Sequence, residues 1–251
     1  ISTFLPVREY TEGHYVFMAT ANGTVKKTPL EHFSRPRSSG LIATNLDEGD
    51  HLIGAVITEG GTEIMMLATS GKAVRFTEDQ VRSMGRNARG VRGIRLKAGE
   101  QVVLLIQPDP EGYILTASEN GFGKRTKVEE FPAYSRGSQG VIAMQCSERN
   151  GNLVRALQLF DGDEMMLISD KGTLVRTRTD EVSVLSRNTQ GVRLIKLSQE
   201  DERLVGVERI AETDEDLDGE VDGDVDSEVD GDIEAPDTGS SPEGDEGAGD
   251  E

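Results

Sequence analysis

The chain has 251 residues, a formal net charge of −19 at pH 7 and a single cysteine. One cysteine excludes an intrachain disulfide framework, and no run reaches the roughly 18–20 apolar residues that a membrane span needs. Residues 211–251 hold 19 of the 46 acidic residues and no Lys or Arg. Residues 1–210 therefore balance 27 acidic residues with 27 basic ones, and local basic clusters among them can still attract a polyanion.

The chain begins with ISTFLPVREY, which lacks an initiator Met and both the basic and the apolar region of a signal peptide. We therefore expect this end to be the cut edge of a longer protein. The lone cysteine also favours a reducing compartment.

Four stretches of the sequence repeat one another, which predicts four copies of one structural unit. The stretches are YVFMATANGTVKKT, EIMMLATSGKAVRF, YILTASENGFGKRT and EMMLISDKGTLVRT, with turn glycines Gly23, Gly71, Gly121 and Gly172. These turn glycines are spaced by 48, 50 and 51 residues. A second glycine series keeps spacings of 50, 50 and 51, at Gly40, Gly90, Gly140 and Gly191. Two landmarks that keep one period are typical of repeat architectures.

Each unit has the pattern of β structure. An apolar run, a turn that contains glycine and a mixed run predict a hairpin, because glycine supplies the positive φ of the turn. After the second glycine follow GLIATNL, GVRGIRL, GVIAMQC and GVRLIKL. A further apolar strand opens the next unit, and ISTFLPV takes this place at the chain start. About four strands per unit predict an all-β, propeller-like array of four blades.

We expect the blades at about residues 1–50, 51–99, 100–152 and 153–210, followed by a disordered acidic tail at 211–251. The start of the tail resembles a calcium-binding loop, but Val225 stands where an EF-hand loop has glutamate. The tail is either a solubilising appendage or an imitation of DNA that competes for basic residues of the body.

The sequence offers no catalytic or metal-binding constellation. Cys146 aligns with Leu46, Leu96 and Leu197 of the other units, which predicts a core residue and not a reactive thiol. No spacing of Cys, His and Asp is that of a metal site. We expect no catalytic residue, no metal site and no cofactor in this chain.

Residues 120–126, NGFGKRT, resemble a phosphate-binding loop. A P-loop requires G-x-x-x-x-G-K-[ST], but Ser118 takes the place of the first glycine and Arg125 follows the lysine. The phosphate that this stretch would bind therefore belongs to a nucleic-acid backbone and not to a nucleotide.

Basic residues recur at fixed offsets from the two glycine series. A base stands four residues after each turn glycine, and another stands four residues before the second glycine in three units. Exposed strands carry Lys and Arg for solvation alone, but solvation requires no register, so we expect a ring of bases that binds phosphates. The predicted phosphate contacts are Lys26, Lys27, Arg35, Arg37, Lys72, Arg75, Arg86, Arg89, Arg92, Lys124, Arg125, Lys127, Arg136, Arg176, Arg178 and Arg187.

The expected nucleic acid is a duplex. Platforms for single strands stack bases on aromatic side chains, worth about 1–3 kcal/mol per base. Here Tyr and Phe number only eleven, and none recurs at a fixed position among the basic residues of the repeats. We expect duplex DNA bound through its backbone, and bent DNA on a curved basic rim.

The stretches FMATANGTVKKT, MGRNARGVRGIRL, ENGFGKRT, GTLVRT and SRNTQGV closely resemble the C-terminal domain of the A subunit of bacterial DNA gyrase. The resemblance covers residues 1–210 nearly end to end. It implies a β-pinwheel, a relative of the propeller whose blades exchange strands. It also implies that the domain wraps duplex DNA around a basic perimeter, so that the holoenzyme introduces negative supercoils with ATP.

The resemblance further implies partners: the rest of the gyrase A polypeptide and the gyrase B polypeptide, in an A2B2 holoenzyme of the bacterial cytoplasm, associated with the nucleoid. ATP and Mg²⁺ are used elsewhere in that holoenzyme. The chain alone is expected to catalyse nothing, because its four tyrosines lie within or beside the repeats. Two features depart from the family: the Q-R-R-G-G-K-G box is absent, and four units stand where six are usual. The chain thus resembles the last four blades and the tail.

Two alternatives remain open. The equivalent domain of topoisomerase IV has a similar fold with more degenerate blade motifs. A propeller that serves as a protein-interaction scaffold would carry the same repeats without binding DNA.

Overall fold

The computed structural model describes residues 3–199 and 201–210, and all of them belong to one compact unit. The acidic tail predicted for residues 211–251 lies outside this range. No helix in the described part is long and apolar enough to cross a membrane.

The strands are β1 (Tyr15–Thr20), β2 (Thr24–Pro29), β3 (Leu52–Thr58), β4 (Glu63–Ala68), β5 (Lys72–Thr77), β6 (Val91–Arg92), β7 (Val102–Ile106), β8 (Tyr113–Ser118), β9 (Phe122–Lys127), β10 (Val141–Ile142), β11 (Leu153–Leu159), β12 (Glu164–Ser169), β13 (Leu174–Arg178), β14 (Val192–Arg193) and β15 (Leu204–Ile210). A short 3-10 helix follows the hairpin of each repeat: η1 (Leu30–Phe33), η2 (Glu78–Gln80), η3 (Val128–Glu130) and η4 (Thr179–Glu181).

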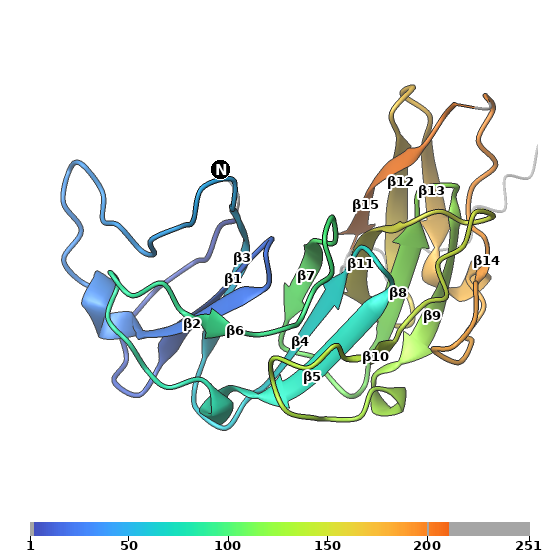
Figure 1. The fold of residues 1–251 in the computed structure, drawn as a ribbon. Helices are drawn as coiled ribbons and strands as arrows, with labels where there is room; N and C mark the ends of the chain where they lie inside the picture. The colour runs from blue at the N-terminus through green and yellow to red at the C-terminus, as the bar shows by residue number, and fades with distance from the viewer. Residues whose placement is uncertain (1–2, 200, 211–251) are drawn as a thin grey trace, which may run out of the picture. The chain divides into compact units, whose positions relative to one another are not determined.

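The strands form four antiparallel sheets, which Figure 1 shows in chain order from blue to orange. Their strand orders are β3-β1-β2-β6, β10-β5-β4-β7, β11-β8-β9-β14 and β13-β12-β15. Consecutive sheets meet through one edge strand each, since β3 lies against β7, β7 against β11 and β11 against β15. The predicted all-β array of four blades is confirmed, and the fourth blade has three strands among the described residues.

Each blade is built on the hairpin that the sequence predicts. Gly71 has a φ of +74° at the turn between β4 and β5, and its N–H donates to the carbonyl of Ala68 at 2.9 Å. A side chain strongly disfavours this left-handed conformation, so glycine holds the turn position. The turn glycines of the other three repeats also have positive φ.

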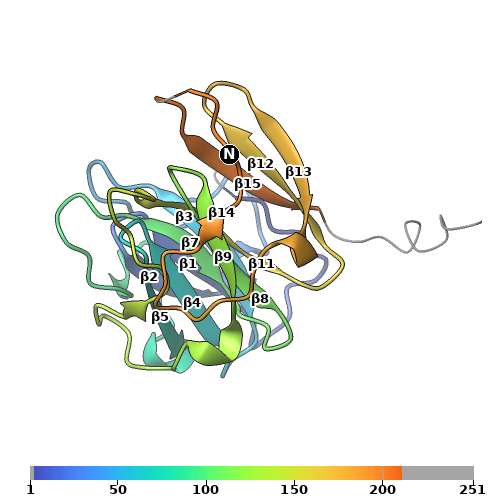
Figure 2. The ribbon, with the colours of Figure 1, turned by 90° about the vertical axis from the view of Figure 1, so that its right-hand side faces the viewer.

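The fourth strand of each complete blade comes from the following repeat. Strand β6 pairs with β2, β10 with β5 and β14 with β9. The exchange is fixed by main-chain bonds, since the N–H groups of Ala143 and Met144 donate to the carbonyl of Gly71 at 2.8 and 3.0 Å. Figure 2 shows β14 beside β9. The exchange of strands that the resemblance implied is therefore confirmed.

Two strand expectations are corrected. The apolar strand predicted to open each unit instead closes the blade before it, because β3 pairs with β1, with Ile57 opposite Val16. The described part of ISTFLPV, residues 3–7, forms no strand, and neither do residues 40–46. Neither stretch pairs with a strand of the described chain.

Within the described residues, three hydrophobic cores lie between consecutive sheets. Successive residues of β4 point to opposite faces, so Met66 enters the first core and Met65 the second. In the first core the rings of Phe17 and Phe76 lie 6.3 Å apart between their centroids. Both faces of β4 are thus packed, which explains its unbroken apolar run. Cys146 is half-buried and packs against the second core, which agrees with its alignment to leucines; its lack of reactivity stays a prediction.

Candidate nucleic-acid interface

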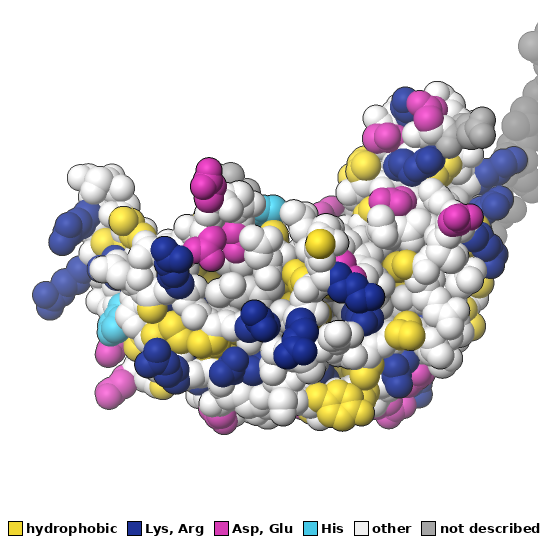
Figure 3. Space-filling view, in the orientation of Figure 1, with side chains coloured by type: hydrophobic (Ala, Val, Ile, Leu, Met, Phe, Trp, Pro, Cys, Tyr) yellow, Lys and Arg dark blue, Asp and Glu magenta, His cyan; other side chains and the backbone are white. Residues whose placement is uncertain are grey.

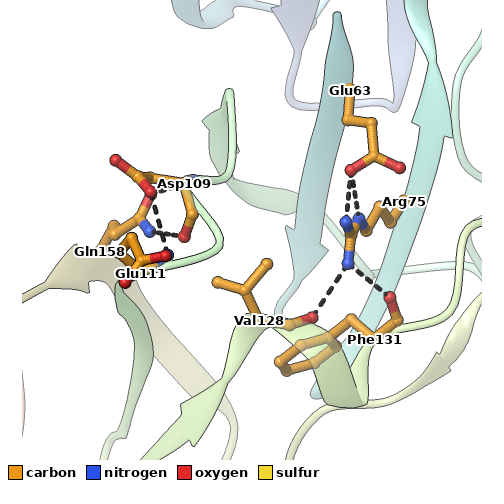
Figure 4. Close-up of polar contacts among 7 residues, drawn as sticks. All are labelled: Glu63, Arg75, Asp109, Glu111, Val128, Phe131 and Gln158. Carbon is orange, nitrogen blue, oxygen red and sulfur yellow. Dashed lines mark hydrogen bonds and ion pairs between the residues drawn. The ribbon is translucent and has the colours of Figure 1, made fainter.

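In the first three repeats, the basic residue four positions after the turn glycine contacts the following repeat. Arg75 on β5 donates from Nη1 to the carbonyl oxygens of Val128 and Phe131, both at 3.0 Å. Its Nε donates to Glu63 at 2.9 Å, and its Nη2 bonds the same carboxylate (Figure 4). The guanidinium of Arg75 therefore fixes the end of η3 against the second blade.

Arg125 and Lys27 hold the same position on β9 and β2, and both are buried. Arg125 donates from Nε to the carbonyl of Val182 at 2.9 Å and from Nη1 to Asp161 at 3.1 Å. The ammonium of Lys27 lies 3.7 Å from the buried carboxylate of Glu78. Lys27 thus contacts the 3-10 helix of the following repeat, and Arg125 bonds the residue that follows the 3-10 helix η4 of the following repeat. Arg125 also bonds Asp161, in the loop before β12.

Lys124, the lysine of NGFGKRT, is fully buried. Its ammonium donates to the carbonyl oxygens of Ser186 and Arg187, each at 2.6 Å, and to Oγ1 of Thr189 at 3.0 Å. Burial lowers the pKa of Lys124 to about 8; the charge of Glu130 opposes this shift and that of Arg187 adds to it. All three N–H groups of the ammonium are occupied by the loop of the fourth repeat.

Lys26 is buried in the same way on β2. Its ammonium donates to the carbonyl of Ala43 at 2.8 Å and also bonds the carbonyl of Arg86. Burial, and secondarily the charge of Arg86, lowers the pKa of Lys26 to about 8. The equivalent positions on β5 and β13 are Val74 and Val175, so lysine alternates with valine at a position that faces inward.

These contacts correct part of the predicted interface. Lys26, Lys27, Lys124 and Arg125 are buried and bonded to the protein itself, so they cannot donate to a phosphate in this fold. Arg75 belongs with them, since its side chain is only 16% exposed. The fixed register of these bases is real, but it arises because the contact between consecutive repeats recurs.

The arginine four residues before the second glycine makes a second recurring contact. In three repeats the Nη1 of this arginine donates to the equivalent main-chain carbonyl of the preceding repeat, two residues after the second glycine. The three pairs are Arg86 with Ile42 at 3.5 Å, Arg136 with Arg92 at 3.1 Å and Arg187 with Ile142 at 3.1 Å. We call this contact the arginine latch. All three arginines are half-buried, so part of each residue stays exposed to solvent.

The other predicted residues lie at the surface. Lys72 is half-buried, and the exposed ones are Arg35, Arg37, Arg89, Arg92, Lys127, Arg176 and Arg178. Some pair with acids, such as Arg89 with Asp47 at 2.8 Å. Figure 3 shows Lys and Arg side chains in a band across one face of the molecule.

Several exposed basic residues lie outside the predicted set, among them Arg95, Arg149, Arg193 and Lys196. Arg193 stands on β14 where Arg92 stands on β6, and Lys196 aligns with Arg95. Comparing the donated strands in register would have found these pairs. The guanidinium groups of Arg149 and Arg193 lie 4.7 and 5.4 Å from the ring centroid of Phe122, which brings two positive charges together at the edge of the third blade.

Comparison with known proteins gives a consistent result. The family described as "DNA gyrase C-terminal domain, beta-propeller" matches residues 14–59, 62–108, 112–158 and 163–211. The A subunit of DNA gyrase from Salmonella typhimurium (strain LT2) is 58% identical over 220 residues, which cover 87% of this chain and 25% of that protein. The same protein from Pseudomonas aeruginosa is 62% identical over 209 residues, which cover 82% and 22%. The chain therefore spans about a quarter of the length of these curated relatives.

Two solved structures share the fold. A structure titled "Structure of DNA gyrase A C-terminal domain" has a TM-score of 0.71 at 26% identity and covers 82% of this chain and 68% of its own. The C-terminal domain of DNA topoisomerase IV has a TM-score of 0.75 at 26% identity and covers 82% and 64%. The two solved structures are alike in fold and in their 26% identity to this chain, whereas the two gyrase A polypeptides are 58% and 62% identical to it.

Proposed function

Because the chain belongs to the family of DNA gyrase C-terminal β-propeller domains, we propose that it binds and wraps duplex DNA as the C-terminal part of the gyrase A polypeptide. The supporting observation is the position of the exposed bases Arg92 and Arg193. Both stand on donated strands, β6 and β14, at the sheet edge opposite the strands through which the blades meet. Both arginines are exposed.

The chemistry of these side chains fits the DNA backbone. Arginine and lysine donate to phosphate oxygens without reading the sequence, and each neutralised phosphate releases counterions from the duplex. Blades in a row would offer such contacts one after another along a bent duplex. Bending a site of 20–30 base pairs costs about 1–6 kcal/mol, which the added contacts offset.

In this proposal the chain supplies binding and bending, and the chemistry belongs to other parts of the holoenzyme. The rest of the gyrase A polypeptide and the gyrase B polypeptide would use ATP and Mg²⁺ to pass one duplex through another in the bacterial cytoplasm. Wrapping by this chain would fix the direction of passage, so that negative supercoils result.

The second candidate is the equivalent domain of topoisomerase IV, which the shared fold supports. The identity of 58–62% to the A subunit of gyrase favours gyrase. A protein-interaction scaffold is the third candidate, and it predicts no effect on DNA topology.

Ligation of a nicked circular plasmid in the presence of the chain tests the proposal. Wrapping should shift the linking number of the closed product in proportion to the bound protein. A variant with Arg92, Arg95 and Arg193 changed to Ala should shift it less at equal protein concentration. An unchanged linking number under conditions where the chain saturates the DNA would refute wrapping and favour the scaffold.

A further inference from the structure

Tyr134, in the loop between η3 and β10, combines a fixed main chain with an exposed side chain. Its N–H donates to the carbonyl of Arg75 at 2.8 Å, and its own carbonyl accepts from Nε2 of Gln80 at 3.3 Å. The residue is nevertheless 55% exposed. Among the described residues, no aromatic ring or cationic group stacks on its ring. A ligand can therefore meet this ring without first having to order the loop.

The equivalent residues of the second and fourth repeats make the same main-chain bond but are less exposed. The N–H of Met84 donates to the carbonyl of Lys27 at 2.9 Å, and that of Leu185 donates to the carbonyl of Arg125 at 2.8 Å. Both residues are half-buried, and Met84 packs against the first core. Of these three repeats, the third alone exposes a large ring at this place.

The donated strand of the same blade, β10, lacks the arginine that its neighbours carry. Ile142, which is 37% exposed, stands where the donated strands of the first and third blades have arginine. Ile142 lies opposite Lys72 on β5, and Tyr134 is bonded to Arg75, three residues further along the same strand. At about 3.3 Å per residue, the two apolar residues are attached about 10 Å apart along the outer edge of the second blade.

Basic residues surround this apolar edge. Residues 131–145 contain no Asp or Glu. Arg136 in this stretch donates to the carbonyl of Arg92 at 3.1 Å, and the N–H of Arg95 donates to a carbonyl of the stretch at 2.8 Å. Arg92 and Arg95 are both exposed, and on the other side Lys72 donates to a glutamine of the stretch at 3.2 Å. An apolar edge framed by positive charge is complementary to a duplex, whose apolar base stack lies between two rows of phosphates.

We propose that Tyr134 inserts between two stacked base pairs of the bound duplex and kinks it at the second blade. The inference rests on the proposed function, because it requires duplex DNA along this edge. Apolar side chains that enter a base step from the minor groove unstack it and bend the duplex by about 20–90°. The surrounding basic residues hold the phosphates on both sides of the step, and Ile142 lies against sugars of the same groove. One local kink thus supplies part of the curvature of a wrapped duplex.

An inserted ring gives the chain a preference among base steps without a hydrogen bond to any base. Pyrimidine–purine steps such as TA unstack most easily. The two duplexes to compare are about 30 base pairs long, near the length of a bent site, and consist of a purine run followed by a pyrimidine run. Exchanging the central A and T creates a single TA step without changing composition or charge. The TA duplex should bind about fivefold more tightly than its partner.

The measurements are the affinity for each duplex and the permanganate oxidation of the central thymines, which reports unstacking. In the parent complex the thymines of the TA step should become reactive. Tyr134→Ala should abolish both the preference and the reactivity, whereas Tyr134→Phe, which keeps the ring, should retain both. The dependence of log affinity on log salt should not change in either variant, because no charge is removed. Tyr10→Ala is the matched control, since it removes a ring that is 41% exposed on the segment before β1.

Equal affinity of the parent for the two duplexes, with binding itself intact, overturns the wedge and leaves the proposed function standing. A TA preference that survives in Tyr134→Ala, or that Tyr10→Ala loses equally, overturns it as well. If Tyr134→Ala changes neither measurement, the exposed ring serves a partner other than DNA, such as a protein, and the wedge is again refuted. Absence of binding to either duplex overturns both proposals.

Discussion

The ammonium of Lys124 donates a 2.6 Å hydrogen bond to the main-chain oxygen of Arg187. Both residues are among the predicted phosphate contacts, but Lys124 holds the loop that carries Arg187. The guanidinium of Arg187 in turn donates to Ile142 on the donated strand β10. The repeated bases therefore form two groups: buried ones that position loops and strands, and outer ones that remain accessible to a ligand.

We expect Arg92→Ala and Arg193→Ala each to weaken binding to all duplex sequences alike. Each change should flatten the dependence of log affinity on log salt by about 0.9, the contribution of one phosphate contact. Fluorescence anisotropy with a labelled duplex across a salt series measures the slope.

Arg155 supplies the matched control for these variants. It is an exposed arginine on β11, one of the strands through which the blades meet, and it pairs with Glu208 at 3.0 Å. Arg155→Ala removes the same charge and should leave the slope unchanged. Equal slopes for all three variants would mean that the outer strands do not contact phosphate.

Gly191→Ala should destabilise the fold more than Gly40→Ala. The two glycines have nearly the same φ, +78° and +79°, so the cost of a left-handed alanine, about 1–2 kcal/mol, is common to both. Only at Gly191 would the new Cβ overlap the main chain of Gly123, which adds about 1–3 kcal/mol. Urea denaturation at low protein concentration measures both free energies of unfolding. Equal losses would show that the close approach of β14 to β9 is absent in solution.

Lys124 should make stability depend on pH in the alkaline range. Its pKa is about 8 in the folded chain against an ordinary 10.5, so between these values the unfolded state binds more protons and the free energy of unfolding rises with pH. The full shift corresponds to roughly 3 kcal/mol. Lys124→Met lacks this titration, so the stability of the parent relative to the variant should increase from pH 7.5 to pH 10.

Denaturant unfolding of both proteins over this pH range measures the difference. Lys127→Met, which removes an exposed lysine at the end of the same strand, controls for the loss of a lysine at alkaline pH. Parallel stability curves for the parent and Lys124→Met would contradict the burial of a charged ammonium at this site.

Deletion of residues 211–251 should tighten DNA binding. This segment lies outside the described residues, and the prediction rests on its 19 acidic residues and its attachment to a body with exposed bases. A tethered segment acts at an effective concentration in about the millimolar range, and salt screens its charge over about 10 Å at 0.1 M. The gain in affinity should be largest at low salt. Equal affinities of full chain and truncation at the lowest salt would make the tail a solubilising appendage.

The sequence predicts the blades well because two places in each repeat have a positive φ that favours glycine. It does not predict that β3 closes the first blade, because an apolar strand between two hairpins can pair with either. It also does not tell whether a periodic base meets a phosphate or a carbonyl oxygen. One signal for burial was present: the position of Lys26 and Lys124 is valine in the other two repeats, and a position that accepts valine is suited to the interior.

The exchange of strands also sets the order in which the chain can fold on the ribosome. Val25 on β2 stays unpaired at this edge until Val91 on β6 has been synthesised. At about 5–20 residues per second, this delay lasts roughly 3 to 13 seconds, and it recurs for the second and third blades. The newest blade of a growing chain is thus always incomplete, and a chaperone that shields a bare strand edge would find one substrate per repeat. Among the described residues, β13 is the outer strand that has no such partner.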